Sequence, residues 1–227
     1  MRIPTKQQWQ FADKTNFINT ETPEGISAYA MGLKCDELLG RSFNARFSKS
    51  IPRFCESYMG IETDKEARTR IYQHFQTHLL MAMWGVANAA MDIGLEEGKD
   101  RALVEKTLLL ASTVYEVTAE VIGEDAREFW DKEAQVVSGY YREITKEAWD
   151  SLGEGNEDDG DIFKELYNIG IIFLSDFLNL MRGRVGSDLD DEREYVLNDG
   201  WDLTEPIASI VSGTFLSIRC MRTPGSP

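Results

Sequence analysis

The segment 158–184, with the sequence DDGDIFKELYNIGIIFLSDFLNLMRGR, constrains the fold more than any other part of the chain. In an α-helix successive residues are about 100° apart, so the apolar residues of this segment cover most of the circumference. The main stripe is Ile162, Leu166, Ile169, Phe173, Phe177 and Leu180, widened by Phe163, Tyr167, Leu174, Leu178 and Met181. A helix that is apolar on most sides is packed on most sides. The segment is therefore predicted to be a central helix that other helices wrap.

Periodic apolar residues predict the helices around it. They place helices at 26–39, 64–95, 101–122 and 125–152, and a last helix that begins near Pro206. The run 188–205 is expected to be a charged connector of one or two helical turns. No alternating strand pattern occurs, and short loops between long helices favour antiparallel neighbours. We predict an all-α bundle of six to eight helices.

The length of 227 residues fits one large domain with an appendage. Residues 1–62 are expected to form a smaller helical region packed on the bundle, residues 63–222 the bundle, and residues 223–227 a disordered tail. The first residues contain no charged leader followed by an apolar run. The three cysteines lack metal-binding spacing and indicate reduced thiols. These features favour a cytoplasmic protein that does not enter a membrane.

The net charge of −15 argues against a nucleic-acid partner, because the chain would repel a polyanion. One window, 41–53, is basic, and Arg46, Lys49 and Arg53 lie in it. These three cations could hold a small anionic ligand. In the alternative interpretation, the window pairs with an acidic run, 154–165 or 188–205, and ties the N-terminal region to the bundle. Pro52 is expected to break or to begin a helix there.

The two histidines indicate a metal site. His74 and His78 stand four residues apart on one predicted helix, so both imidazoles lie on one face. This spacing suits Zn²⁺ or another divalent metal, provided that carboxylates such as Glu165 supply further ligands. The alternative is coincidence, with one histidine packed in the core and the other exposed.

Two carboxylates are candidates for acid–base catalysis. Glu133 lies within the apolar arc of its helix, where an ionised carboxylate is costly unless it is paired. Asp176 lies at the edge of the narrow polar side of the predicted central helix, next to its apolar residues. If His78, Glu165 and these two carboxylates converge, they form a metal or acid–base site. The alternative for Glu133 is an ion pair or a hydrogen bond to a tyrosine.

Function classes can be ranked on these observations. Known catalytic motifs fail on spacing or lack partner residues, which favours a non-catalytic binding or interaction protein. Its partner would be another protein or a second copy of the chain. The alternative is a divalent-metal-dependent enzyme with a carboxylate site between bundle helices. A third class is a small-molecule binder with an inter-helical pocket lined by Trp84, Trp130, Tyr140 and Tyr141.

Overall fold

The computed structural model describes residue 22 and residues 41–106, 109, 122–151, 159–183 and 190–219. Within these ranges no residue lies in a strand. The helices are α4 (Arg41–Met59), α5 (Lys65–Glu96), α7 (Glu124–Ser151), α8 (Asp159–Met181), α9 (Asp190–Asp199) and α10 (Trp201–Arg219). The predicted all-α class is confirmed, and α5 and α7 match the predicted helices at 64–95 and 125–152. None of these helices combines the length and the apolar character that a bilayer crossing requires.

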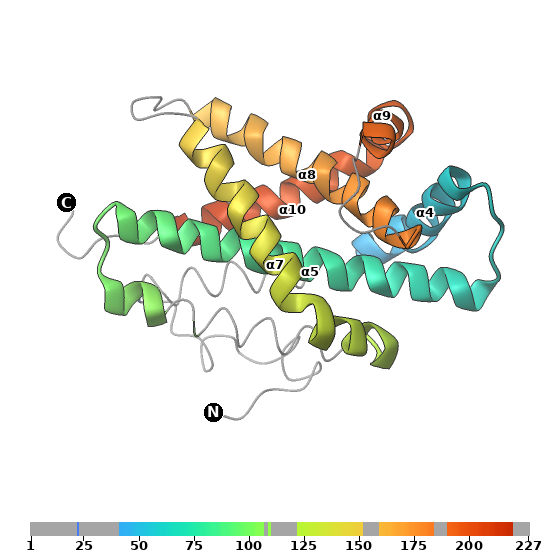
Figure 1. Ribbon diagram of the computed structural model, residues 1–227, viewed down its shortest axis with the longest axis horizontal. Coiled ribbons are helices and arrows are strands. Elements are labelled where there is room, and N and C mark those ends of the chain that lie inside the picture. Colours follow the sequence, from blue (N-terminus) through green and yellow to red (C-terminus); the bar gives the residue numbers. More distant parts are fainter. Residues whose placement is uncertain are drawn as a thin grey trace.

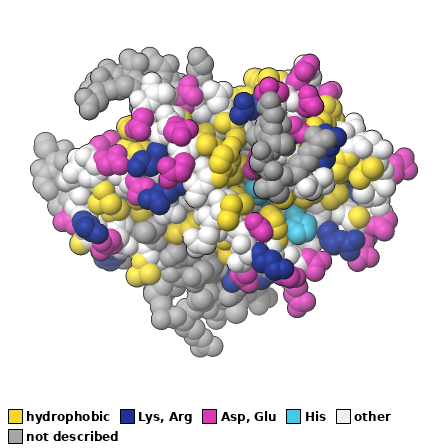
Figure 2. Space-filling view, in the orientation of Figure 1, with side chains coloured by type: hydrophobic (Ala, Val, Ile, Leu, Met, Phe, Trp, Pro, Cys, Tyr) yellow, Lys and Arg dark blue, Asp and Glu magenta, His cyan; other side chains and the backbone are white. Residues whose placement is uncertain are grey.

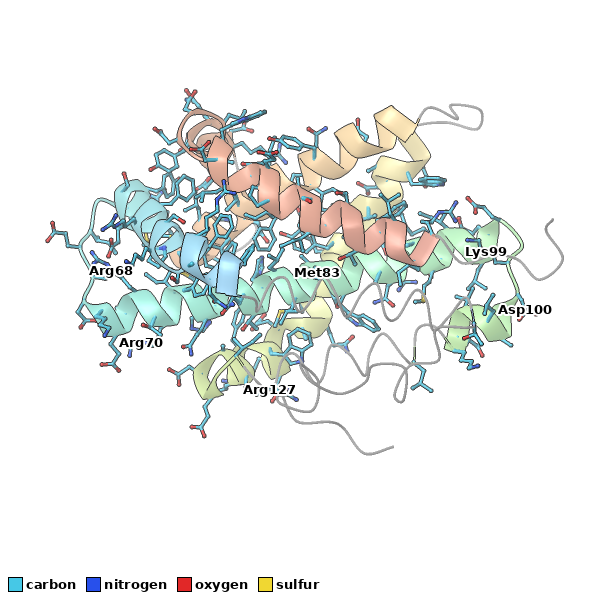
Figure 3. All side chains as sticks on the ribbon, turned by 180° about the vertical axis from the view of Figure 1, so that it is seen from behind. Arg68, Arg70, Met83, Lys99, Asp100 and Arg127 are labelled. Atoms are coloured by element: carbon cyan, nitrogen blue, oxygen red, sulfur yellow. The ribbon has the colours of Figure 1, made fainter. Side chains whose placement is uncertain are left out.

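Helix α5 is the element on which α4, α7, α8 and α10 pack. It runs along the whole molecule and α7 crosses it, while α4, α8 and α10 also contact it (Figure 1). Every residue from 75 to 83 is buried, so this part of α5 is surrounded on all sides. Figure 3 shows Met83 in this middle stretch, with Arg68 and Arg70 near one end of the helix and Lys99 beyond the other.

The structure does not show segment 158–184 as the central helix. Helix α8 buries one side in the core, but other apolar residues of its described part, Ile171, Ile172 and Leu180, are only partly buried. The longest buried run among the described residues is 75–83 of α5, which the sequence analysis placed among the helices around the central one. This run includes three polar residues, 76–78.

Each of those three polar side chains has a partner inside the protein. Gln76 donates to Asn44 Oδ1 on α4 at 3.3 Å. Thr77 donates to the Gln73 carbonyl one turn earlier at 2.9 Å, and His78 bonds to α8, as described below. A buried polar group is tolerated when it is hydrogen-bonded, so α5 can be enclosed in spite of its polar residues.

Small residues let α7 approach α5 closely. A Cβ atom at Gly85 would lie 2.8 Å from the Tyr141 Cβ and would also collide with the Ser138 carbonyl oxygen. Beyond this crossing point, two ion pairs join the same helices. Arg142 Nε lies 2.6 Å from an Asp92 oxygen, and Lys146 Nζ lies 2.9 Å from a Glu96 oxygen. The glycine therefore sets the spacing between α5 and α7.

Two prolines lie inside helices, where the sequence prediction placed helix boundaries. Helix α4 continues through Pro52, and α10 begins at Trp201 rather than near Pro206. Pro206 has no N–H, so the carbonyl four residues earlier, that of Asp202, loses its usual donor. Arg46 Nη2 donates to this carbonyl at 3.0 Å. The predicted connector is also helical over ten residues, as α9.

Helix α4 shares the core with α5 and is fastened to its start by Glu56. The Glu56 carboxylate accepts hydrogen bonds from Arg68 Nε at 2.8 Å and Arg68 Nη2 at 3.1 Å, and also from Thr63. These bonds, chiefly those from Arg68, lower the pKa of Glu56 to about 2.

The predicted helix 26–39 and the tail 223–227 lie outside the described residues, and the division of the chain at residue 62 stays a prediction.

Replacing Gly85 with alanine tests the close crossing of α5 and α7. The added methyl has no room, so we expect G85A to lower the free energy of unfolding by about 1–3 kcal/mol, the usual cost of overpacking. Gly139 on α7 is a matched control, because a Cβ there meets nothing within 4 Å. G139A should raise stability by about 0.5–1 kcal/mol through helix propensity. Urea denaturation measures both, and an equal response to the two substitutions would contradict the packing described.

Candidate functional site

Three polar side chains meet where α5, α7 and α8 pack together. The Asp176 Oδ2 atom lies 3.0 Å from His78 Nε2 and 3.1 Å from the Tyr141 hydroxyl. Two of the residues that the sequence singled out, His78 and Asp176, are therefore brought into contact. We call these three residues the polar cluster.

The two donors of the polar cluster are buried, whereas the acceptor reaches the surface. The side chain of His78 is 3% exposed and that of Asp176 is 30% exposed, and Tyr141 is completely buried. The carboxylate of Asp176 is thus held from the inside by two groups that do not themselves reach solvent.

Aromatic rings enclose the imidazole of His78. The centroids nearest to its own are those of Phe173 at 5.2 Å, Tyr141 and Phe177 at 6.0 Å, and Phe129 at 6.5 Å. Since a carboxylate accepts hydrogen bonds, we assign the donor in this contact to Nε2. The other ring nitrogen, Nδ1, is also buried, and no described residue forms a hydrogen bond with it.

Tyr141 is fixed as a donor by its surroundings. Burial, and then the negative charge of Asp176, raises the pKa of Tyr141 well above its ordinary value. The neighbouring Tyr140 is 40% exposed. Its pKa is raised first by burial and second by Asp176. Both phenols therefore stay protonated at neutral pH.

The structure does not bring Glu133 and Glu165 into the polar cluster. Glu133 is half-buried on α7, and it precedes Tyr141 by eight residues, a distance of about 12 Å along a helix. Glu165 accepts a hydrogen bond from Asn168 at 3.3 Å and lies about 16 Å from Asp176 along α8, at 1.5 Å per residue. A catalytic role for Glu133 stays a prediction.

The predicted metal ligands do not assemble either. His74 is half-buried, and its ring stands edge-on to Phe129 with centroids 5.4 Å apart. Burial lowers its pKa, which favours the neutral form. Among the described residues, which include His74, His78 and Glu165, no three His, Cys, Asp or Glu side chains are grouped so that they could hold one metal ion.

Of the three cations in the basic window, Arg46 makes contacts within the protein. Arg46 donates to the Asp202 carbonyl and also lies over the ring of Phe47, 5.1 Å from its centroid. Lys49 and Arg53 are exposed. The contact of Arg46 with residue 202 supports the interpretation that the window joins α4 to the 188–205 run. An anionic ligand at these cations stays a prediction.

The four aromatic residues of the predicted small-molecule pocket do not share one environment. Trp84 and Trp130 are partly buried against the core, Tyr141 is enclosed, and Tyr140 is exposed. Two surface hollows in the described part lie elsewhere, around the start of α7 and the first turns of α5. Neither hollow is lined by an aromatic side chain.

The corner between α9 and α10 exposes two large apolar side chains among acidic ones. Leu197 is 51% exposed and Trp201 is 57% exposed. We define the α9–α10 corner as these two residues with the exposed acids Asp190, Asp191, Glu194, Asp199, Asp202 and Glu205. Figure 2 shows acidic side chains gathered beside hydrophobic ones at the upper right, where Figure 1 places α9.

Buried contacts hold this corner in place. Glu192 on the inner side of α9 is 1% exposed; it accepts a hydrogen bond from the Tyr58 hydroxyl at 2.7 Å, and Arg182 lies 3.6 Å away. At Gly200, between α9 and α10, an added Cβ would lie 3.0 Å from the ring of Phe54. The corner is therefore fastened to α4 and to the end of α8.

Sequence reasoning missed the α9–α10 corner and the bond between Tyr141 and Asp176. It named Tyr141 only as a lining residue of the predicted pocket, but a buried tyrosine hydroxyl needs a partner, and this requirement could have indicated its role. Leu197 and Trp201 gave no comparable signal, because their exposure depends on how α9 and α10 pack.

Comparison with known protein-family models, with curated proteins and with solved structures finds no match to this chain. Function must therefore be argued from the described residues alone.

Replacing Tyr141 with phenylalanine tests the polar cluster. The substitution removes one of the two donors to Asp176, so we expect Y141F to lower the free energy of unfolding by about 1 kcal/mol. Tyr140 is a matched control, since no described residue bonds to its hydroxyl, and Y140F should change stability by less than about 0.5 kcal/mol. Equal values for Y141F and Y140F in urea denaturation would show that the hydrogen bond to Asp176 contributes nothing.

Proposed function

We propose that this protein is a non-catalytic binding protein whose partner is a protein segment with basic residues around an apolar anchor. The observation that carries this proposal is the exposure of Leu197 and Trp201 within the acidic α9–α10 corner. Exposed apolar patches with a polar rim mark interaction sites. Tryptophan is among the residues that contribute most to binding in protein interfaces.

The charge around these two residues selects the partner. Between residues 190 and 205 the chain carries seven acids, of which only Glu192 is buried, against one cation, Arg193. Complementary charge steers association and suppresses wrong partners. A second copy of the chain would place one set of acids against another. The corner therefore fits a basic partner better than self-association.

The geometry suits a short partner segment. Leu197 and Trp201 are four residues apart, so their Cα atoms lie within about 14 Å of each other. A single helix of three turns can cover that distance. Because α9 is fastened through Glu192, and because Arg46 caps the freed carbonyl in α10, the surface is ordered before a partner arrives. Preorganisation lowers the entropic cost of binding.

The two buried members of the polar cluster are not placed to transfer a proton to a molecule bound at the surface. The imidazole of His78 and the phenol of Tyr141 are buried and directed at Asp176. Neither group can reach a molecule bound at the surface directly. A general acid or base must lie within hydrogen-bond reach of the proton that it transfers.

A designed peptide tests the proposal. The probe is a fluorescein-labelled amphipathic helix of about 18 residues, roughly five turns, built from Lys and Leu; the comparison peptide carries Glu in place of Lys. We expect only the Lys peptide to bind, with an affinity that falls as salt screens the charges. W201A should weaken binding at least tenfold, a loss of about 1.4 kcal/mol, and L197A should weaken it less. Fluorescence anisotropy measures each affinity.

Val136 on α7 supplies the control for exposed apolar area. It is 69% exposed and lies outside the corner, so V136A should leave the affinity unchanged. Binding that is equally weakened by V136A and W201A would mean a nonspecific apolar effect. Equal binding of the Lys and Glu peptides would contradict the proposed charge selection.

A further inference from the structure

We propose that the α9–α10 corner selects an arginine side chain of its partner segment, which stacks on the ring of Trp201 and pairs with the carboxylate of Glu205. This selectivity rests on the proposed function, because it concerns the same surface and the same partner. It adds which of the two common cationic side chains the surface prefers, and which two residues decide that preference.

The ring of Trp201 is both supported and accessible. It packs against the ring of Tyr167 on α8, with centroids 5.4 Å apart and planes tilted by 50°. This contact holds the indole in place, yet Trp201 remains 57% exposed. Within the described ranges, no Lys or Arg lies over the indole, although arginines lie over three other aromatic rings. The exposed ring therefore offers a cation a surface that the described part of the chain does not use.

The carboxylate of Glu205 lies on the same face of α10 as the indole. Glu205 follows Trp201 by four residues, a spacing that brings Cβ atoms on a helix to about 5–6 Å from each other. Glu205 is exposed, and no described residue forms an ion pair or a hydrogen bond with its carboxylate. Its negative charge also raises the pKa of Tyr167, second to burial, in agreement with this placement. One helix face thus presents a ring and a carboxylate together.

The protein uses the same combination of groups within its own packing. Arg219 at the end of α10 lies over the ring of Trp149, 4.9 Å from its centroid. The same guanidinium donates to both carboxylate oxygens of Glu97, at 2.6 Å and 2.7 Å. A tryptophan ring and a glutamate are therefore sufficient to hold one arginine. Trp201 and Glu205 supply these two groups at the surface, where the arginine would come from the partner.

The chemistry of the two groups favours arginine over lysine. A guanidinium is planar, so it can stack on an aromatic face while its N–H groups point at a carboxylate. A lysine ammonium is a compact and strongly hydrated charge, so it gains less from the ring. Leu197 then remains for the apolar anchor of the partner segment.

Two labelled peptides of equal length test the preference, one built from Arg and Leu and the other from Lys and Leu. We expect the unmodified protein to bind the Arg peptide at least fivefold more tightly, a difference of about 1 kcal/mol. W201L keeps an apolar side chain but removes the ring, so the two affinities should come within about twofold, or roughly 0.4 kcal/mol. W201F keeps a ring and should retain the preference. Fluorescence anisotropy measures each affinity.

Glu205 is tested against a matched acid of the same corner. Glu194 is exposed on α9, and E194Q and E205Q remove the same charge. E194Q should weaken the binding of both peptides equally and leave the ratio of their affinities unchanged. E205Q should weaken the binding of the Arg peptide more and lower the ratio, because the guanidinium loses its paired carboxylate.

The outcomes separate this selectivity from the proposed function. Equal affinity of the two peptides for the unmodified protein, an unchanged ratio in W201L, or equal ratios in E205Q and E194Q would each overturn the selection of arginine by Trp201 and Glu205. Each of these results leaves the proposed function in place, because that requires only that the Lys peptide binds. Failure of both peptides to bind would contradict both proposals.

Discussion

The enclosure of α5 is the constraint on which the rest of the structure depends. Its residues 75–83 are buried without interruption although they include Gln76, Thr77 and His78. A buried polar group without a partner costs about 1–3 kcal/mol. Helices α4 and α8 must therefore present Asn44 and Asp176 at matching positions. These hydrogen bonds select one arrangement of the surrounding helices, whereas apolar contacts alone would tolerate several.

The candidate site is a consequence of this packing. Because Gly85 admits α7 closely, Tyr141 of α7 is brought within reach of the Asp176 that His78 requires. The carboxylate then lies at the boundary between core and solvent, with two buried groups bonded to its Oδ2 atom. Similar reasoning applies to the α9–α10 corner, where the buried Glu192 positions α9 so that Leu197 remains exposed. In both places a buried polar contact determines what the surface offers.

Local periodicity predicted the all-α class and the extents of α5 and α7, because those patterns depend on residues close in sequence. Local periodicity did not predict which helix is the most buried, since hydropathy cannot tell whether a polar residue such as His78 will find a hydrogen-bond partner. The hypothesis of a converging site included both His78 and Asp176, which the structure brings together. It also included Glu133, and the sequence held no sign that this residue would lie outside the polar cluster. Helix register decides which side chains meet, and register depends on contacts such as Gly85 with α7. The continuation of α10 through Pro206 could not be predicted for a similar reason. The Asp202 carbonyl, which Pro206 leaves without a donor, accepts a hydrogen bond from Arg46, and Arg46 is remote in sequence.

Native-state hydrogen exchange of the backbone amides tests the enclosure of α5 most directly. Amides in the most enclosed elements exchange only through global unfolding, whereas those in exposed elements exchange through local opening. The account predicts that residues 75–83 have the highest free energy of exchange, equal to the global free energy of unfolding from denaturation. It also predicts lower values at 165–172 in α8. Slower exchange at 165–172 than at 75–83 would show that α8, and not α5, is the enclosed helix.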